Sequence, residues 1–286
     1  SAAGLVFDHA SQYFTVSDPE FRSMVDEWVA AGVVASWDGP VGMLKADGGG
    51  FSALPAGEKG RWVCRGGMRA LAEHLAKTLE ERYPQTAEVV RPMWVSKMEP
   101  AADPAAGGSA RRALGWNLTG NNKPQGTFDA VVIAHNGKCA NRLVAPAGAP
   151  LVAKQLMSLK LTALWSLMVA FDGKVPNCTF EGAFVDGGDT LGWVANNTAK
   201  LALQHPGMPH LSCWTLQSND AYAKRNKVPQ ERVPDDVQEK ITEELLCAFA
   251  SALGVPRSSL PRVAFSRAQL WGAAVPANSP KVPTIL

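Results

Sequence analysis

The sequence predicts a mixed α/β fold with two domains. Residues 128–135 (FDAVVIAH) form a nearly continuous apolar run of strand length, which is typical of a strand buried on both faces of a parallel sheet. Three later segments are rich in aromatic residues and suit the antiparallel or mixed sheet of a second domain. These segments are residues 161–172, 182–196 and 211–217. The 286 residues, 46% of them hydrophobic, suffice for one large domain or two smaller ones.

The first 35 residues are expected to hold a short strand and a helix. Residues 7–16 alternate loosely and carry aromatic and β-branched side chains, which favours a strand. Ser17-Asp-Pro-Glu20 then offers an N-cap, a proline in the first turn and a capping-box carboxylate. Apolar residues recur at helical spacing up to Gly32, which is placed to end the helix in a left-handed conformation. One face of this helix should pack inward.

A hairpin and a second helix are expected next. Residues 37–60 are dense in Gly, Pro and Asp, which indicates turns and a hairpin with an exposed Gly48-Gly-Gly50 tip. Residues 61–64 are expected to form a strand. The Gly66-Gly67 pair permits a sharp turn into an amphipathic helix over residues 68–79.

Further along the chain, residues 88–98 and 113–118 are predicted strands, joined by the Pro-, Ala- and Gly-rich loop 99–112. Near the end, Asp235 or Asp236 is expected to cap a long helix that ends at Gly254. Five apolar residues should line one face of this helix. They are Val237, Ile241, Leu245, Phe249 and Leu253.

Composition excludes several classes of protein. The formal net charge is +2 and the Lys and Arg residues are scattered, so neither nucleic acid nor an anionic membrane is an expected partner. The sequence contains no run of about 18 apolar residues, the length that a helix needs to span a bilayer. A soluble protein is therefore expected. The five cysteines lack C-x-x-C or other regular spacing, which favours a reducing compartment over a disulfide framework or zinc site.

Local motifs identify no catalytic residue. The nucleophile elbow G-x-S-x-G, the zinc motif H-E-x-x-H, the dinucleotide loop G-x-G-x-x-G and the Walker A loop are all absent from the sequence. His205 and His210 are close together, but the prolines and glycine between them favour a surface turn over a metal site. No metal site is predicted.

Two cysteines have basic neighbours that could lower a thiol pKa and create a nucleophile. They are Cys64 beside Arg65 and Cys139 beside Lys138. Buried, inert cysteine is the more frequent situation, and it is the one we expect here.

Several segments in order resemble the renalase-like branch of the flavin-dependent amine oxidase superfamily, and the match spans nearly the whole chain. Residues 7–14 (FDHASQYF) resemble the family element F-D-x-G-A-Q-Y-F, whose backbone passes beside the flavin ring. Here Ala10 and Ser11 replace the usual Gly-Ala. Gly66-Gly-Met68 resembles the family's G-M helix start, and Val95 falls where a strand valine commonly meets the adenine end of FAD.

Other segments extend the resemblance. Trp116 matches the family's G-W strand, and residues 129–134 (DAVVIA) resemble its D-A-V-V-x-A strand. Three more segments are closest to the plant and algal form of the family, for which a chloroplast location is implied. They are residues 138–143, 191–197 and 270–276.

The resemblance implies an incomplete Rossmann-like FAD domain over residues 1–145 and a substrate-type domain over residues 146–265. Residues 266–286 would hold a strand that returns to the FAD domain. The family's N-terminal G-x-G-x-x-G segment and its C-terminal FAD-binding segment have no counterpart in the sequence. The implied cofactor is FAD. The implied cofactor-binding residues are Ala10, Ser11, Gln12, Gly66, Gly67, Val95 and Trp271.

Two functions remain open. The first is an FAD-dependent oxidoreductase that transfers hydride from a reduced small molecule, an amine or a reduced nicotinamide, to the flavin. Trp271, Trp193 and Trp165 are candidates for an aromatic wall above the ring, although a sheet Trp is core packing about three times more often. His9 is a second substrate-side candidate, with a hydrogen-bonded loop histidine as the alternative. The second function is a noncatalytic scaffold or interaction subunit of a larger assembly, which would bind a protein partner.

Overall fold

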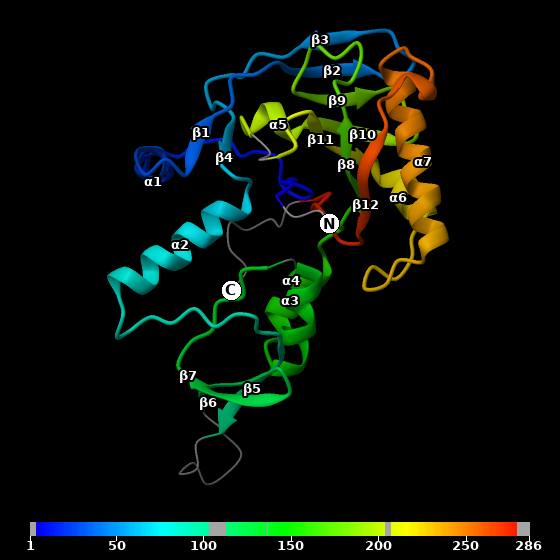
Figure 1. The fold of residues 1–286 in the computed structure, drawn as a ribbon. Coiled ribbons are helices and arrows are strands. Elements are labelled where there is room, and N and C mark those ends of the chain that lie inside the picture. The colour runs from blue at the N-terminus through cyan, green and yellow to red at the C-terminus, as the bar shows by residue number, and fades with distance from the viewer. Residues whose placement is uncertain (1–3, 103–112, 136, 204–206, 279–286) are drawn as a thin grey trace. The chain divides into compact units, whose positions relative to one another are not determined.

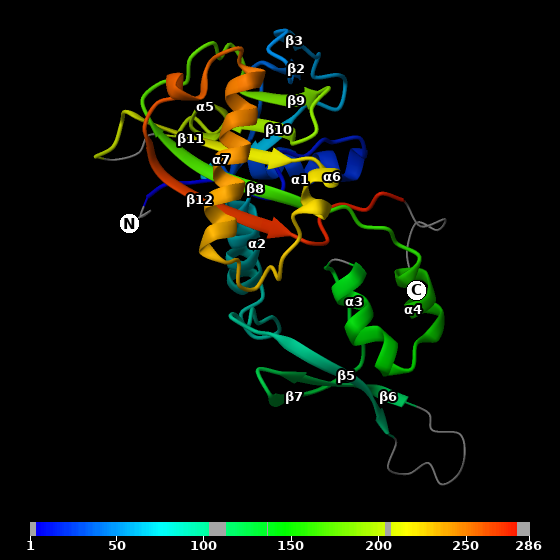
Figure 2. The ribbon, with the colours of Figure 1, turned by 90° about the vertical axis from the view of Figure 1, so that its right-hand side faces the viewer.

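The computed structural model describes residues 4–102, 113–135, 137–203 and 207–278 of the chain. The chain forms two compact units (Figures 1 and 2). Unit 1 comprises residues 1–87 and 163–272, and unit 2 comprises residues 88–162 and 273–286. These units divide the chain at positions other than the expected borders at 145 and 265. The cofactor and substrate roles assigned to residues 1–145, 146–265 and 266–286 stay predictions.

A seven-stranded mixed sheet is the centre of unit 1 (Figure 1). Neighbouring strands pair antiparallel except β2 and β9, which are parallel. The predicted antiparallel segments 161–172, 182–196 and 211–217 supply three of its strands and most of a fourth, so this part of the prediction is confirmed. In sheet order the strands are β12 (Val263–Trp271), β8 (Leu164–Asp172), β11 (Leu211–Ser218), β10 (Leu191–Asn196), β9 (Gly182–Asp186), β2 (Val41–Lys45) and β3 (Phe51–Ala53).

The predicted long helix, α7 (Asp235–Ala252), covers one face of this sheet (Figure 2). Ile241, Leu245 and Phe249 are fully buried against it, as the helical spacing predicted. Gly254 has φ +67° and follows the helix end, as expected. The N-cap is Pro234, however, and Asp235 and Asp236 lie in the first turn, where their charges favour the helix dipole. The cap prediction was therefore wrong by one residue.

The first helix, α1 (Pro19–Ala30), is confirmed, and Gly32 has the predicted positive φ. Its N-cap is Asp18, which accepts a hydrogen bond from the Phe21 N–H at 2.8 Å. Because Pro19 occupies the first helical position, the cap shifts from Ser17 to Asp18 and Glu20 stands too early for a capping box. That detail of the prediction was wrong.

Two short strands and a second helix follow. β1 (Val34–Ser36) pairs antiparallel with β4 (Trp62–Cys64), the strand predicted at 61–64. The predicted hairpin is formed by β2 and β3. Helix α2 (Arg69–Arg82) is confirmed, but none of its residues is buried, and Leu75 and Leu79 are 42% and 41% exposed. Leu71, at the start of the predicted amphipathic face, packs against the Trp28 cluster, whereas the later part of that face is uncovered.

Residues 7–16 form no named strand, which corrects the prediction for this segment. Their main contact with another segment's backbone is an isolated antiparallel bridge between Phe14 and Trp62. Buried side chains hydrogen-bond the carbonyl groups of Asp8, Ala10 and Gln12 instead of a neighbouring strand. Two small helices of unit 1 contribute to its polar interior and surface, α5 (Asn197–Lys200) and α6 (Asp220–Arg225).

Unit 2 is built on a three-stranded antiparallel sheet of β5 (Val95–Ala102), β6 (Ala113–Gly120) and β7 (Lys123–Phe128). Helices α3 (Gly137–Val144) and α4 (Pro150–Met157) pack with it around Met98. The predicted strand at 88–98 thus begins only at Val95. Of the predicted loop 99–112, residues 99–102 extend β5 and the remainder lies outside the described residues.

The prediction of a buried parallel strand over residues 128–135 was wrong. Phe128 ends β7, residues 129–135 have no strand assignment, and the Val132 side chain is 90% exposed. The run was expected to join a parallel sheet, and β2 with β9 is the sole parallel pair among the described residues. Val131 and Ile133 instead pack partly against the Met98 cluster.

Substitutions at two adjacent valines test this arrangement. Val132→Asp is expected to change the free energy of unfolding by less than about 0.5 kcal/mol, because the side chain is already in solvent. Val131→Asp is expected to cost more, about 1–3 kcal/mol, because it places a carboxylate against the Met98 cluster. Denaturant titration of both variants measures this. Large and equal losses would mean that the segment is a two-sided buried strand after all.

Candidate functional site

Five of the predicted site residues border one hollow of unit 1, with a volume of about 610 Å³. Two segments far apart in sequence line it, residues 5–11 and residues 66–69. His9, Ala10, Ser11, Gly66 and Gly67 are all among them. Two of the segments that resemble family elements, at residues 7–14 and 66–68, therefore contribute to one hollow.

Buried side chains hold the carbonyl groups of the first segment. The Thr215 hydroxyl donates to the Asp8 carbonyl at 3.1 Å, and the Trp271 indole N–H donates to the His9 carbonyl at 3.1 Å. The Gln217 amide donates to the Ala10 carbonyl at 3.1 Å. Thr215 and Gln217 belong to β11 of the main sheet, so these carbonyls point toward the sheet.

The N–H groups of the same peptides point the other way. In a trans peptide the N–H lies opposite the preceding C=O, so the N–H groups of His9, Ala10 and Ser11 face away from β11. Within the described residues none of the three has a hydrogen-bond partner, whereas the Asp8 N–H donates to Asn197 Oδ1 at 3.2 Å. Ala10 and Ser11 are exposed and line the hollow. We call these three donors the N–H strip.

A buried ion pair fixes the same segment. Lys200 Nζ lies 2.8 Å from Asp8 Oδ2, and the two side chains are 0% and 3% exposed. The ammonium also donates to the Gln12 carbonyl at 3.1 Å, and it lies 5.8 Å from the centre of the Trp37 ring. Burial lowers the pKa of Lys200, and the Asp8 charge opposes that shift. Desolvation of two charges is costly, so the pair adds little net stability, whereas removal of one partner would leave the other charge buried and unpaired.

The second oxygen of Asp8 connects to the glycine turn. Asp8 Oδ1 accepts a hydrogen bond from the Met68 N–H at 2.7 Å, just before α2 begins. Gly66 and Gly67 have φ of +82° and +95°, which confirms the predicted sharp turn. A Cβ on Gly67 would lie 3.0 Å from Val6 Cγ1 and 3.1 Å from Asp8 Oδ1, so the turn packs tightly against the segment and a larger residue there would have to displace these atoms.

His9 and Trp271 are stacked, with ring centres 5.4 Å apart and an interplanar angle of 12°. Burial lowers the pKa of His9, the Arg267 charge lowers it further, and Asp8 opposes both. The imidazole is therefore favoured in its neutral form near pH 7. The structure thus brings together the cofactor candidate Trp271 and the substrate-side candidate His9.

The other predicted residues lie elsewhere. Gln12 is buried and its amide donates to the Asp8 and Ala10 carbonyls, so it anchors the segment from inside. Trp165 is fully buried in the main core, and its indole N–H donates to the Asn226 carbonyl. Trp193 is buried in an aromatic cluster with Tyr13 and Trp37. The surroundings of both tryptophans are those of packing residues.

Val95 belongs to unit 2, where it lines a separate hollow of about 480 Å³. Trp94, 69% exposed, and Arg142 line the same hollow. The Trp94 backbone is held by Asn121, whose side chain accepts from the Trp94 N–H at 3.0 Å.

The predictions for the two cysteines have different outcomes. Burial raises the pKa of Cys64 to about 11, so it is an inert thiol, as expected. Cys139 is exposed, which differs from the expected burial, and the Lys138 side chain lies outside the described part. His205 also lies outside it. Among the described residues no group of three or more metal-ligating side chains is close enough to hold an ion.

Sequence analysis missed the residues that hold the site in place. Asp8 stands inside the quoted motif, but its partners Asn197, Lys200 and Thr215 come from α5 and β11, 189 to 207 residues away. A polar residue within an apolar strand, such as Thr215 or Gln217, is the signal that could have indicated a buried network. Lys200 had no comparable signal.

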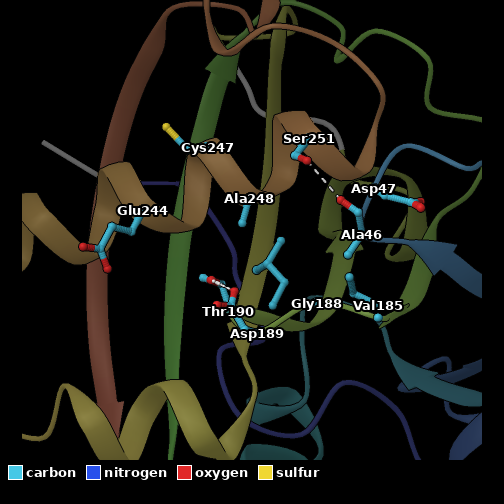
Figure 3. A pocket seen from close by; sticks show the side chains of 12 residues that line it. Ala46, Asp47, Val185, Gly188, Asp189, Thr190, Glu244, Cys247, Ala248 and Ser251 are labelled. Carbon is cyan, nitrogen blue, oxygen red and sulfur yellow. Dashed lines mark hydrogen bonds between the residues drawn. The ribbon is translucent and has the colours of Figure 1, made fainter.

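A second hollow in unit 1, of about 750 Å³, lies among α7, the β2–β3 hairpin tip and the β9–β10 turn (Figure 3). No predicted site residue lines it. Several of its polar groups are already engaged, including the Ser251 hydroxyl with the Ala46 carbonyl at 3.0 Å and Glu244 with the Tyr222 hydroxyl. Its acidic residues alone identify no ligand.

No protein-family model matches the sequence. Among solved structures, the chain is similar to a protoporphyrinogen oxidase candidate from Exiguobacterium sp. 255-15, with a TM-score of 0.52 and 14% identity over 80% of this chain. It is also similar to an oxidoreductase from Methanosarcina mazei (TM-score 0.48, 14% identity, 77% of this chain). A redesigned putrescine oxidase gives a TM-score of 0.48 and 11% identity over 77% of this chain.

The chain covers 43%, 46% and 45% of these three structures, less than half of each. At this identity the likeness to the first structure concerns the fold, and the mixed α/β class predicted from the sequence is confirmed. In the described part of the chain, no helix combines the length and apolar character that a membrane crossing requires.

Proposed function

We propose that this chain is the flavin-facing part of an FAD-dependent oxidoreductase of the renalase-like branch. The observation that supports this proposal is the N–H strip. Three adjacent donors that have no partner among the described residues border a hollow of about 610 Å³, and they suit the carbonyl- and nitrogen-rich edge of an isoalloxazine ring. Flavin, when bound, supplies hydride acceptance. The chain's own residues bind and orient that edge and shield it from water.

The residues fit the ring end of the cofactor. The Gly67 backbone lies close against Val6 and Asp8, and the buried Asp8–Lys200 pair holds the segment that carries the N–H strip. Oriented donors in a partly dry site interact more strongly with developing negative charge than donors in water do. These residues do not account for binding of the FAD phosphate groups, because the sequence contains no G-x-G-x-x-G loop.

Val95 is proposed, from the family resemblance, to contact the adenine end of FAD, and the surroundings given for it are those of unit 2 alone. Val95 lines a hollow there with an exposed indole, Trp94, on which a planar heterocycle can stack, and with the cation of Arg142, which can meet a phosphate. The plant and algal resemblance supports a chloroplast location, and the substrate classes proposed are amines and reduced nicotinamides.

A scaffold or interaction subunit is the second candidate. Exposed apolar side chains favour it, above all Leu75 and Leu79 on α2 of unit 1 and Val132 in unit 2. Such surfaces are typical of sites that meet another protein. A colourless chain that purifies in a stable complex would support this candidate over the first.

Addition of FAD to the purified chain tests the first candidate. The bound fraction is expected to show the two visible absorbance bands of protein-bound flavin. Ser11→Pro removes one donor of the N–H strip and should raise the dissociation constant about three- to tenfold, the value of one hydrogen bond. Ser11→Ala keeps the N–H and should bind as the parent does. Absence of flavin binding by the parent chain would refute the proposal.

A further inference from the structure

The hollow of unit 2 contains a thiol that the proposed function does not use. Cys139 is exposed, and it lines this hollow of about 480 Å³ together with Trp94 and Arg142. Cys139 and Arg142 lie three residues apart on α3, so they share one face of the helix. The hollow therefore combines a nucleophilic sulfur, a cation and an aromatic surface.

The cation and the aromatic surface are open to a ligand. Arg142 forms no ion pair within the described residues, and it is the charged residue of the lining. Trp94 is 69% exposed, and in the described part of the chain its indole contacts no other aromatic ring. An open guanidinium beside an open indole suits a small molecule with an acidic group on a planar or apolar body.

Three of the other thiols are poor nucleophiles. Burial raises the pKa of Cys64, Cys178 and Cys213 to about 11 each. Little thiolate is present at such positions at neutral pH, and the thiolate is the form that attacks a disulfide. Exchange with an added disulfide is therefore expected at the two exposed cysteines, Cys139 and Cys247.

Cys247 on α7 offers a comparison within the same chain. It also lines a hollow, of about 750 Å³, but the charged residues of that lining are acidic, namely Asp47, Asp189 and Glu244 (Figure 3). Its thiol donates to Glu243 at 3.3 Å, and burial, followed by that carboxylate, raises the pKa of Cys247. The two exposed thiols thus lie in hollows of opposite charge.

We propose that Cys139 is a site of thiol–disulfide exchange that selects small anionic disulfides. Arg142 attracts the acidic group, Trp94 supports the body of the molecule, and Cys139 supplies the attacking sulfur. The half of the disulfide that stays on Cys139 occupies the hollow.

The exchange balances without a further oxidant. The Cys139 thiol releases its proton to solvent, and its sulfur forms a new S–S bond with one sulfur of the disulfide. The S–S bond of the disulfide breaks, and its electron pair leaves with the other half as a thiolate. The Cys139 sulfur is oxidised, and the departing sulfur is reduced.

One consequence rests on the proposed function. Val95, proposed for the adenine end of FAD, lines the same hollow, so a group held on Cys139 competes with adenine. The mixed disulfide should raise the dissociation constant for FAD about tenfold or more, and dithiothreitol should restore the original value. Cys139→Ser should bind FAD equally before and after treatment with the disulfide.

Reagents of opposite charge test the selectivity on the flavin-free chain. Dithiobis(nitrobenzoate) carries two carboxylates, and cystamine carries two ammonium groups. The rates at Cys139 and Cys247 are followed by peptide mass. The rate at Cys139 relative to Cys247 should be about tenfold or more higher with the anionic reagent than with the cationic one. Because the intrinsic reactivity of each thiol is common to both reagents, this difference reports charge.

Arg142→Gln identifies the source of the charge selectivity. It should slow the reaction of Cys139 with dithiobis(nitrobenzoate) about three- to tenfold at low salt and leave the rate at Cys247 unchanged. Lys154→Gln removes an exposed cation of unit 2 that does not line the hollow, and it should behave as the parent.

The outcomes separate this proposal from the proposed function. The same relative rate with both reagents, or an Arg142→Gln rate equal to the parent's, would overturn the exchange site. Selective exchange at Cys139 in a chain that binds no FAD before or after treatment would support the exchange site and refute the proposed function. FAD affinity that the mixed disulfide leaves unchanged would contradict the competition with adenine.

Discussion

Lys200→Met is expected to lower the free energy of unfolding by about 3–5 kcal/mol. The substitution leaves the Asp8 carboxylate buried without its counter-ion, and it also removes the donor to the Gln12 carbonyl. Methionine has a similar length and is apolar, so the loss reports the stranded charge more than a cavity. Denaturant unfolding at neutral pH measures it.

Lys224→Met is the matched control. Lys224 pairs with Asp220 at 2.6 Å, but its side chain is 58% exposed, so the pair is solvated. Loss of such a pair is expected to cost less than about 1 kcal/mol. Equal effects at the two lysines would contradict the buried network around Asp8. A stable Lys200→Met variant with normal flavin affinity would show that the pair does not position the N–H strip.

Trp165→Ala is expected to cost about 3–5 kcal/mol of stability. The indole is fully buried among the strands and α7, and its N–H donates to the Asn226 carbonyl at 3.2 Å, so truncation leaves both a cavity and an unpaired carbonyl. Leu75→Ala on the uncovered face of α2 should change stability by less than about 0.5 kcal/mol.

The stability and the rate of flavin reduction of the Trp165→Ala variant together decide the role of Trp165. If it were part of a substrate wall, truncation would weaken flavin reduction and leave the unfolding midpoint near that of the parent. The packing role requires the reverse, with a lower midpoint and, at temperatures where the variant is folded, a normal rate of flavin reduction. Both quantities can be measured on one preparation.

Local sequence patterns were sufficient to locate elements whose conformation depends on residues adjacent in the chain. Proline at the first helical position and Gly32 located α1, and the acidic pair at 235–236 and Gly254 located α7, each to within a residue or so, because caps and turns depend on a few adjacent dihedral angles. Aromatic and β-branched content likewise located β8 to β11, and the Gly66-Gly67 pair located the turn before α2.

Other features depended on partners distant in the chain. The apolar run at 129–134 has the composition of a central strand, but a strand exists only where neighbours accept its hydrogen bonds, and the described residues provide none for it. The segment 7–16 shows the opposite case, because buried side chains from β11 and α5 replace a neighbouring strand.

For the candidate site, the amino-acid sequence and its resemblance to a family were enough to select His9 to Gln12, the glycine pair and Trp271. They could not show that Asp8 pairs with Lys200, that three N–H groups share one side of the segment, or that Trp165 is inaccessible. Those properties arise when residues up to 262 positions apart come into contact, as His9 and Trp271 do. A sequence pattern does not show which distant residues meet in space. Burial and hydrogen bonding depend on those contacts.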